Sequence, residues 1–321
     1  MKKVSIIVPV YNEEGNVLNA YQALVRQMDT LRGEYDYEII FTDNHSQDKT
    51  FKLLEGLAKS DLRVKVARFS RNFGYQKSIY TGYMLSSGDA VVQFDCDLQD
   101  PPELIGQFIQ KWEEGYAVVY GIRNVRKESW VMNLVRKAFY RFISFLSEDD
   151  LPKDVGDFRL VDKRIVNELR KLYDYYPYIR GLIASFGYEQ TGILYNRADR
   201  KTGKSKFRFI DLINLALDGI VNHSIAMLRI ATYCGFIIFL CAFGFLFVYL
   251  VGRIFFGQTW PKGFATLITI ALFSLSLNAL FLGIIGEYIG RIYQQVKRRP
   301  ITIIDRTVNF DENRIKQGTF S

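Results

Sequence analysis

Residues 4–31 read VSIIVPVYNEEGNVLNAYQALVRQMDTL, and their apolar periodicity changes in the middle. The first eight residues are nearly all apolar and rich in β-branched side chains, which is typical of a buried β-strand. From Val17 onward the apolar residues recur every three or four positions, which is typical of an amphipathic helix. The stretch therefore predicts a strand followed by a helix packed on it.

The same alternation continues along the first half of the chain. Further strands are predicted at YEIIFTD (37–43), VKVARFS (64–70), AVVQFDCD (90–97) and AVVYGIR (117–123). Helical spacing covers residues 48–59, 75–87 and 101–114. Such a series predicts an α/β fold with a doubly wound, mostly parallel sheet and helices on both faces. Neither the Gly-rich dinucleotide fingerprint nor a P-loop follows any of these strands.

The second half of the chain is predicted to enter a membrane. Residues 229–252 and 263–286 carry no charge apart from Arg229, and at ~1.5 Å per residue each can cross a ~30 Å hydrocarbon core. Basic residues follow the second stretch, so the positive-inside bias places the catalytic part and the C-terminus in the cytoplasm of a multi-pass membrane protein. The expected organisation is a catalytic domain (1–205), a juxtamembrane amphipathic segment (206–227), two membrane helices (228–290) and a cytoplasmic tail (291–321).

Composition limits the class of partner without choosing one. The formal net charge of +8 fits nucleic acid, anionic lipid or phosphorylated substrates. The basic residues lie beside the membrane stretches and not on a separate domain, which argues against nucleic acid. The three cysteines show no metal or disulfide spacing and are expected to be reduced thiols.

Residues 93–103, QFDCDLQDPPE, place four carboxylates within a short stretch. Asp100, followed by two prolines and Glu103, has the pattern of a helix start with a capping residue. Asp95 and Asp97 end a predicted strand and should face the same side. Two carboxylates this close favour a cation, and Mg²⁺ is usually held by one or two carboxylates plus substrate phosphates. The alternative is a pair of acids on a surface loop.

Five motifs in order carry a resemblance to a known family. They are VSIIVPVYNEEGN, IIFTDNHSQDKT, FSRNFGYQKS, SSGDAVVQFDCDLQDPPE and VGDFRL. Together they resemble the inverting glycosyltransferases of family two, and more closely the polyprenyl-phosphate glycosyltransferases. The resemblance implies a GT-A-like fold, Mg²⁺ or Mn²⁺ as cofactor, and transfer of a sugar from a nucleotide-sugar donor to a polyprenyl phosphate such as undecaprenyl phosphate. UDP-glucose or a related UDP-hexose is the favoured donor, with UDP-N-acetylglucosamine and GDP-mannose as alternatives, and surface-polymer glycosylation is the expected purpose.

The resemblance also implies roles for individual residues. The nucleotide-sugar would contact Pro9, Tyr11, Asn12, Glu13, Asp43, Asp95 and Gln99, and the metal would bind Asp95 and Asp97. The expected catalytic residues are Asp157, Asp97 and Arg159. The acceptor phosphate would bind Arg123, Arg126, Arg200 and Lys204. Asn44 stands where the family often has a second Asp, and Arg136 stands where it often has Ser.

Two of these roles have alternatives. Asp157 is the family's candidate base, but a phosphate monoester is largely a dianion at pH 7, so Asp157 could instead orient the acceptor or stabilise cationic character at the anomeric carbon. The basic stretch around Arg200 also fits a general patch for anionic lipid.

Besides nucleic-acid binding, two rival functions agree less well with the sequence. A processive polysaccharide synthase would carry a Gln-x-x-Arg-Trp stretch, which is absent. A nucleotide-sensing scaffold would not require Asp95, Asp97 and Asp157 together. A homo-oligomer is expected, because two membrane helices form only a small membrane domain.

Overall fold

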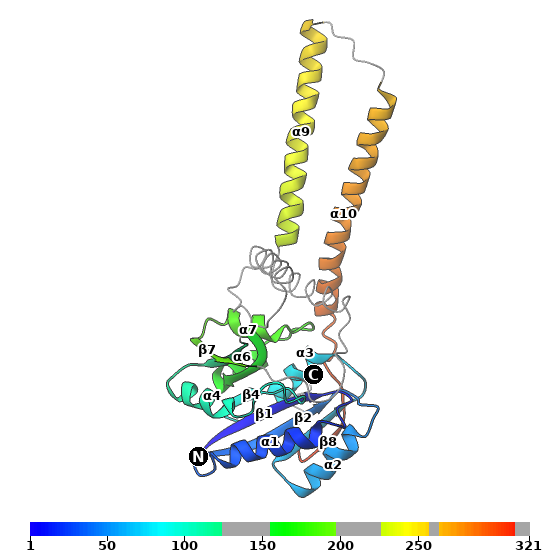
Figure 1. Ribbon diagram of the computed structural model, residues 1–321. Coiled ribbons are helices and arrows are strands. Elements are labelled where there is room, and N and C mark those ends of the chain that lie inside the picture. The colour runs from blue at the N-terminus through cyan, green and yellow to red at the C-terminus, as the bar shows by residue number, and fades with distance from the viewer. Residues whose placement is uncertain (124–154, 197–225, 257–262, 312–321) are drawn as a thin grey trace.

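The computed structural model describes residues 1–123, 155–196, 226–256 and 263–311. Figure 1 shows an α/β domain from which two long helices, α9 and α10, project side by side. The α/β domain contains both the N-terminus and the end of the described chain. The functional residues predicted from the sequence lie in this domain wherever they are described.

The sheet is mixed and mostly parallel, as predicted. Four parallel strands form its centre: β1 (Lys2–Val10), β2 (Tyr35–Asp43), β3 (Val64–Phe69) and β4 (Ala90–Gln93). The full order is β7-β5-β6-β4-β1-β2-β3-β8, in which the remaining strands are β5 (Val118–Arg123), β6 (Val155–Asp162), β7 (Gln190–Tyr195) and β8 (Ile304–Val308). The connecting helices are α1 (Val17–Asp29), α2 (Thr50–Ser60), α3 (Tyr75–Leu85) and α4 (Leu104–Glu113). Each of the central strands and connecting helices lies within a few residues of its predicted position.

Three strands, β6, β7 and β8, were not predicted, and β6 carries catalytic candidates. The sequence pattern did not assign Asp157 and Arg159 to a strand. They lie instead on β6 (Val155–Asp162), which is inserted antiparallel between β4 and β5 (Val118–Arg123). The alternation of Phe158 and Leu160, both buried in the core, with polar neighbours is a period-two strand pattern. A short strand with a glycine and two charges hides this signal.

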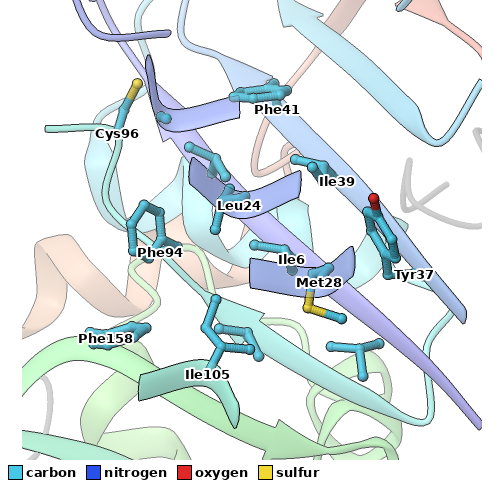
Figure 2. Packing of buried hydrophobic residues seen from close by; sticks show 14 of the residues in the cluster. Ile6, Leu24, Met28, Tyr37, Ile39, Phe41, Phe94, Cys96, Ile105 and Phe158 are labelled. Atoms are coloured by element: carbon cyan, nitrogen blue, oxygen red, sulfur yellow. The ribbon is translucent and has the colours of Figure 1, made fainter. Parts of the chain in front are cut away.

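Helices cover both faces of the sheet, which confirms the doubly wound arrangement. On one face, α1, α2 and α4 pack in one core, and Figure 2 shows Leu24 and Met28 of α1 beside Ile6 of β1. On the other face α3 packs with α6 (Lys163–Lys171) and α7 (Ile179–Ser185), for example through Tyr83 and Leu169. Each fully buried aliphatic or aromatic side chain contributes ~1.5–3 kcal/mol, so the two cores hold the strand ends rigidly.

The start of α4 differs from the prediction. Asp100 was expected to cap this helix, but the N-cap position is Glu103 and no side-chain cap bond forms there. The two prolines make a turn instead, in which the amide of Leu104 donates to the carbonyl of Pro101. Asp100 is fully buried and accepts a hydrogen bond from the hydroxyl of Tyr195 at 2.5 Å. Burial against a tertiary partner thus overrides the local capping pattern.

The C-terminal part returns to the sheet. Helices α9 (Ala226–Phe256) and α10 (Phe264–Val296) are followed by β8 (Ile304–Val308), which pairs antiparallel with β3 at the sheet edge. Strand β8 was not predicted. Among the described residues one segment, Phe273–Val296, is long and apolar enough to cross a membrane. The other predicted span, 229–252, is helical within α9, and its membrane role stays a prediction.

Candidate functional site

The carboxyl ends of β1 and β2 are joined by hydrogen bonds between their loops. Asn12 adopts a left-handed conformation with φ of 54°. Its amide donates to the hydroxyl of Ser46 at 2.9 Å, and its Oδ1 accepts from the amide of Gln47 at 2.7 Å. The amide of Glu13 donates to Thr50 Oγ1 at 2.8 Å. Two predicted nucleotide-site residues, Asn12 and Glu13, are therefore held against the loop that follows Asp43.

Asp43 is a buried carboxylate that is only partly satisfied. Its Oδ1 accepts from the amide of Ser46 at 3.0 Å. Its Oδ2 has no hydrogen-bond partner among the described residues, and the nearest cation, Arg68, lies at 3.6 Å. Burial raises the pKa of Asp43, although the bonds from Ser46 oppose the shift. This carboxylate retains a free acceptor oxygen.

Asn44 has a structural role that the sequence did not reveal. Its side chain donates to Asn72 at 2.8 Å and accepts from the amide of Phe73 at 2.8 Å. These bonds fix the loop before α3, whose N-cap Gly74 has a φ of 96°. The loop therefore presents Tyr75 at a defined position.

Tyr75 reaches the acidic cluster. Its hydroxyl donates to Asp95 Oδ1 at 2.5 Å. Burial, together with the charges of Asp157, Asp100 and Asp97, raises the pKa of Asp95 to about 7 despite that bond. The carboxylates predicted to share a site are therefore close enough to repel one another. Asp97, next along the chain, accepts from the amide of Gln99 at 3.2 Å.

Asp95 and Asp97 fit a site for a divalent ion whose remaining ligands come from the substrate. In the described part of the chain no group of three or more His, Cys, Asp or Glu side chains could hold a metal by itself. Asp95 and Asp97 supply two carboxylates, which is the number that Mg²⁺ usually takes when phosphates supply the remaining ligands. A cation there would also relieve the repulsion that raises the pKa of Asp95.

Strand β6 brings Asp157 to this cluster. Arg159 pairs in register with Gln93 of β4. The same register, continued by two residues on each antiparallel strand, brings Asp157 beside Asp95, in agreement with their electrostatic coupling. Two arginines flank Asp157: Nη2 of Arg159 lies 4.0 Å from its Oδ1, and Nε of Arg180 lies 3.3 Å from the same atom.

Arg123 lies close to Gly156, the residue before Asp157. Its guanidinium is 3.6 Å from the buried Oδ2 of Asp100 and donates to the Tyr195 hydroxyl at 3.3 Å. It also lies against the backbone of Gly156, where a Cβ would stand 2.7 Å from Nη2. A cation is therefore held next to Asp157, and its predicted role toward an acceptor phosphate stays a prediction.

The other predicted residues are placed as follows. Pro9 is buried in β1, and Tyr11 is exposed at the end of that strand. Gln99 is half-buried beside Asp97. Arg126, Arg136, Arg200 and Lys204 lie outside the described residues, so their roles stay predictions.

Sequence reasoning missed Tyr75 and Arg180. Both lie in short segments without a strong motif, and neither residue type alone indicates a site. The tyrosine-rich run YDYYPYIRG at 173–181 is the signal that could have drawn attention to Arg180. For Tyr75, the signal is its position directly after Gly74 in FSRNFGYQKS.

The geometry of the candidate site agrees with the family and the relatives to which the chain is similar. The model of "Glycosyl transferase family 2" matches residues 5–170. The chain belongs to this family. It is 39% identical to the uncharacterized glycosyltransferase YkcC of Bacillus subtilis, over 97% of this chain and 96% of that one. It is 36% identical to the SfII prophage-derived bactoprenol glucosyl transferase of Shigella flexneri, over 95% of this chain and 98% of that one.

Among solved structures, glucosyl-3-phosphoglycerate synthase from Mycobacterium tuberculosis, in complex with Mn²⁺, UDP and phosphoglyceric acid, matches with a TM-score of 0.49 and 15% identity. The match covers 68% of this chain and 76% of that one. The family match and the long relatives establish this protein as a family 2 glycosyltransferase, hence a transferase enzyme with a GT-A-like α/β fold.

Proposed function

We propose that the protein transfers a sugar from a nucleotide-sugar, favouring UDP-glucose or a related UDP-hexose, to a polyprenyl phosphate such as undecaprenyl phosphate, with inversion. The observation that carries the proposal is the position of Asp157 beside Asp95 at the carboxyl edge of the sheet, where open α/β sheets bind ligands. Asp95 would bind the donor's diphosphate through the metal, and Asp157 would act on the acceptor.

Asp43 supports the binding of a nucleobase. Its Oδ2 is buried without a hydrogen-bond partner among the described residues. A buried acceptor left unpaired costs about 1–3 kcal/mol, and an N–H donor from uracil would remove that cost. The hydrogen bond that a uracil N–H would donate to Asp43 Oδ2 would therefore contribute to the binding free energy of the nucleotide.

Asp95 and Asp97 would hold Mg²⁺ or Mn²⁺ together with the donor's diphosphate. The metal would supply positive charge that offsets the charge developing on the departing nucleotide. Tyr75 holds one oxygen of Asp95 through its 2.5 Å hydrogen bond and so limits the orientations of this carboxylate.

Asp157 acts on the acceptor by orientation and charge. Arg159 and Arg180 both lie within 4.0 Å of the same oxygen, so their positive charges fix the direction of this carboxylate. The acceptor phosphate is largely a dianion at neutral pH and needs little deprotonation. A single displacement by its oxygen inverts the anomeric centre. Arg123, with Arg126, Arg200 and Lys204, would bind the phosphate.

The membrane part of the proposal rests on α10 and on the relatives. Segment Phe273–Val296 has the length and composition of a membrane span. The relative from Shigella flexneri is named for bactoprenol, a lipid acceptor. We propose that α9 and α10 both cross the membrane, with the catalytic domain and the C-terminus in the cytoplasm, and that the protein forms homo-oligomers.

Transfer of a radiolabelled sugar tests this function. Purified protein in detergent is supplied with undecaprenyl phosphate, Mg²⁺ and one labelled donor at a time: UDP-glucose, UDP-N-acetylglucosamine or GDP-mannose. We expect label in the lipid phase from a UDP-hexose, and none with Asp97→Asn. Absence of transfer from every donor while nucleotide still binds would contradict the proposed acceptor.

A further inference from the structure

Three consecutive residues at the start of α3 contact three different parts of the protein. Tyr75 donates to Asp95 in the site. Gln76 accepts a hydrogen bond from the amide of Ile179, the first residue of α7, at 3.3 Å. Lys77 places its ammonium 3.5 Å from the ring centroid of Tyr175. The first turn of this helix therefore connects the acidic cluster with residues 173–180.

The same segment contacts the end of α10. Gln295 Oε1 accepts from the amide of Tyr175 at 2.9 Å, and its Nε2 donates to the carbonyl of Tyr173. Arg291 lies 5.4 Å from the ring centroid of Tyr176. The hydroxyl of Tyr173 donates to the carbonyl of Arg299, just beyond the helix. Figure 1 shows α10 meeting the α/β domain at this end.

Tyr176 lies near two cations from different elements. The ammonium of Lys77 of α3 is 5.5 Å from its ring centroid, and the guanidinium of Arg291 of α10 is 5.4 Å from the same centroid. A cation over a tyrosine face is attracted more strongly where water is partly excluded. These rings therefore attach the start of α3 to the end of α10.

Lys77 depends on these rings for its stabilisation. It is half-buried, and no hydrogen bond or ion pair to its ammonium occurs in the described part of the chain. Burial, with the charge of Arg71, lowers its pKa to about 8. The two tyrosine faces, together with the charge of Asp174, offset the cost of a half-buried ammonium close to a second cation.

We propose that Lys77, Tyr175, Tyr176, Arg291 and Gln295, together the cation–tyrosine junction, fix the height of the active site above the membrane and so favour acceptors held in a bilayer. The inference rests on the proposed function. A bilayer fixes the depth of an anchored phosphate, so its effective concentration at Asp157 depends on where α10 holds the domain. A soluble phosphate approaches freely and is insensitive to that position.

The junction also reaches the residues that flank the acceptor. Arg180 follows Ile179 directly and pairs with Asp157 at 3.3 Å. A change at Lys77 or Tyr175 would therefore shift Asp157 and Arg180 together, with the rest of the α/β domain, relative to the bilayer while leaving the acidic cluster assembled. The residues of the cation–tyrosine junction are positioning residues, since none of them contacts the reacting atoms.

The test compares two acceptors in lipid nanodiscs. Wild type and Lys77→Met are assayed with undecaprenyl phosphate in the bilayer and with a short, water-soluble prenyl phosphate. Lys297→Met is the matched control, because Lys297 is an exposed cation at the same end of α10 that stacks 4.1 Å from Tyr293 and lies outside the junction. Binding of UDP is measured for each protein.

We expect Lys77→Met to lower kcat/KM for undecaprenyl phosphate roughly fivefold to tenfold. Transfer to the short acceptor, UDP binding and the Lys297→Met control should stay as in wild type. Equal loss on both acceptors, or loss on neither, would overturn the proposal. If the wild-type protein is inactive on every polyprenyl phosphate, that result would instead contradict the proposed function.

Hydrogen exchange gives a second, independent test. The amides of Tyr175 and Ile179 are bonded to Gln295 and Gln76. Both should exchange faster in Lys77→Met than in wild type, and an unchanged exchange would overturn the proposal. If wild type uses undecaprenyl phosphate but not the short acceptor, this measurement decides the role of the junction.

Discussion

Strand β2 carries two buried carboxylates, and their surroundings are opposite. Glu38, in its first half, accepts hydrogen bonds from Ser5 at 2.6 Å and Ser87 at 2.7 Å, and pairs with Lys3 and Lys65. Burial alone would raise the pKa of Glu38, but these partners lower it to about 2. Asp43, at the carboxyl end, keeps one oxygen unbonded, and burial raises its pKa.

The same contrast separates the two ends of the sheet. Glu38 is compensated by the protein itself and ties β1, β2 and the turn after α3 together. Asp43 is buried and Asp95 is partly buried at the opposite end, neither with cations as close as those of Glu38 in the described residues, and both have raised pKa values. Since buried charge is unfavourable until paired, the carboxyl end is the part of the domain that a cation or a ligand would stabilise.

The largest expected effect is loss of turnover on changing a carboxylate of the acidic cluster. Asp95→Asn removes one of the two carboxylates proposed to bind the metal and should lower kcat by about 10²–10³-fold. The measurement is steady-state transfer of labelled sugar to undecaprenyl phosphate. Asp305→Asn, exposed on β8, is the control and should behave as wild type. If Asp95→Asn turns over within threefold of wild type, the carboxylates at the carboxyl end of the sheet are no more important for catalysis than Glu38 at the opposite end.

Changing the compensated carboxylate should affect stability and not turnover. Glu38→Gln should lower the free energy of unfolding by on the order of 3 kcal/mol, because Lys3 and Lys65 lose their buried partner. The depressed pKa means that this contribution is present above about pH 4.5 and is lost as the pH falls toward 2.

Urea unfolding at pH 7 and pH 3 measures this effect, with the exposed Glu34→Gln as control. The difference in stability between wild type and Glu38→Gln should shrink at the lower pH. Turnover per folded molecule should be unchanged at pH 7. A loss of turnover in the folded variant would show that Glu38 serves the site after all.

The raised pKa of Asp95 gives the metal affinity a pH dependence. The pKa of about 7 means that Asp95 takes up a proton as the pH falls below 7, and that proton competes with the metal. Affinity for Mn²⁺ should fall by up to about tenfold per pH unit between pH 7 and pH 5. Through Asp95 the metal-free protein should also lose stability as the pH rises from about 4 to 7.

Titration with Mn²⁺ at several pH values, with measurement of released protons, checks this dependence. At pH 6 close to one proton should leave for each metal bound. An affinity independent of pH over this range would show that Asp95 is already ionised, like Glu38, in the ligand-free protein.

A smaller effect is expected at Tyr75. Tyr75→Phe removes the hydroxyl that holds Asp95 Oδ1 and should weaken Mn²⁺ binding roughly threefold to tenfold, the value of one hydrogen bond. The fold should be unaffected, since the tyrosine is more than one-third exposed. Tyr176→Phe, which keeps its ring in the junction, is the control. Unchanged metal affinity in Tyr75→Phe would show that the hydroxyl does not orient Asp95.

Local periodicity predicted the strands and helices that alternate regularly, because burial on one or both faces imposes a pattern that a single segment shows. It did not predict β6, β7 or β8. Strand β6 is inserted between β4 and β5 and places Asp157 by pairing with a distant strand, while β8 joins the sheet after the long helices α9 and α10. Such pairings depend on tertiary contacts that no local pattern contains.

The same limit applies to the candidate site. Asp95, Asp97 and Asp157 were found from their motifs, and the structure places Asp95 and Asp157 together. The capping pattern of Asp100 was misleading, because the energy of its buried contact with Tyr195 exceeds that of a helix cap. Tyr75 and Arg180 act through contacts with those acids, and only the fold shows these contacts.

Mn²⁺ binding in the presence of UDP, followed by electron paramagnetic resonance, tests most directly whether uncompensated carboxylates form the functional end of the sheet. Wild type, Glu38→Gln and Asp95→Asn would be titrated side by side at pH 7.5. Wild type and Glu38→Gln should bind Mn²⁺ alike, and Asp95→Asn should show no binding at the same concentrations. Equal binding by Asp95→Asn, or a loss confined to Glu38→Gln, would contradict the assignment of the site.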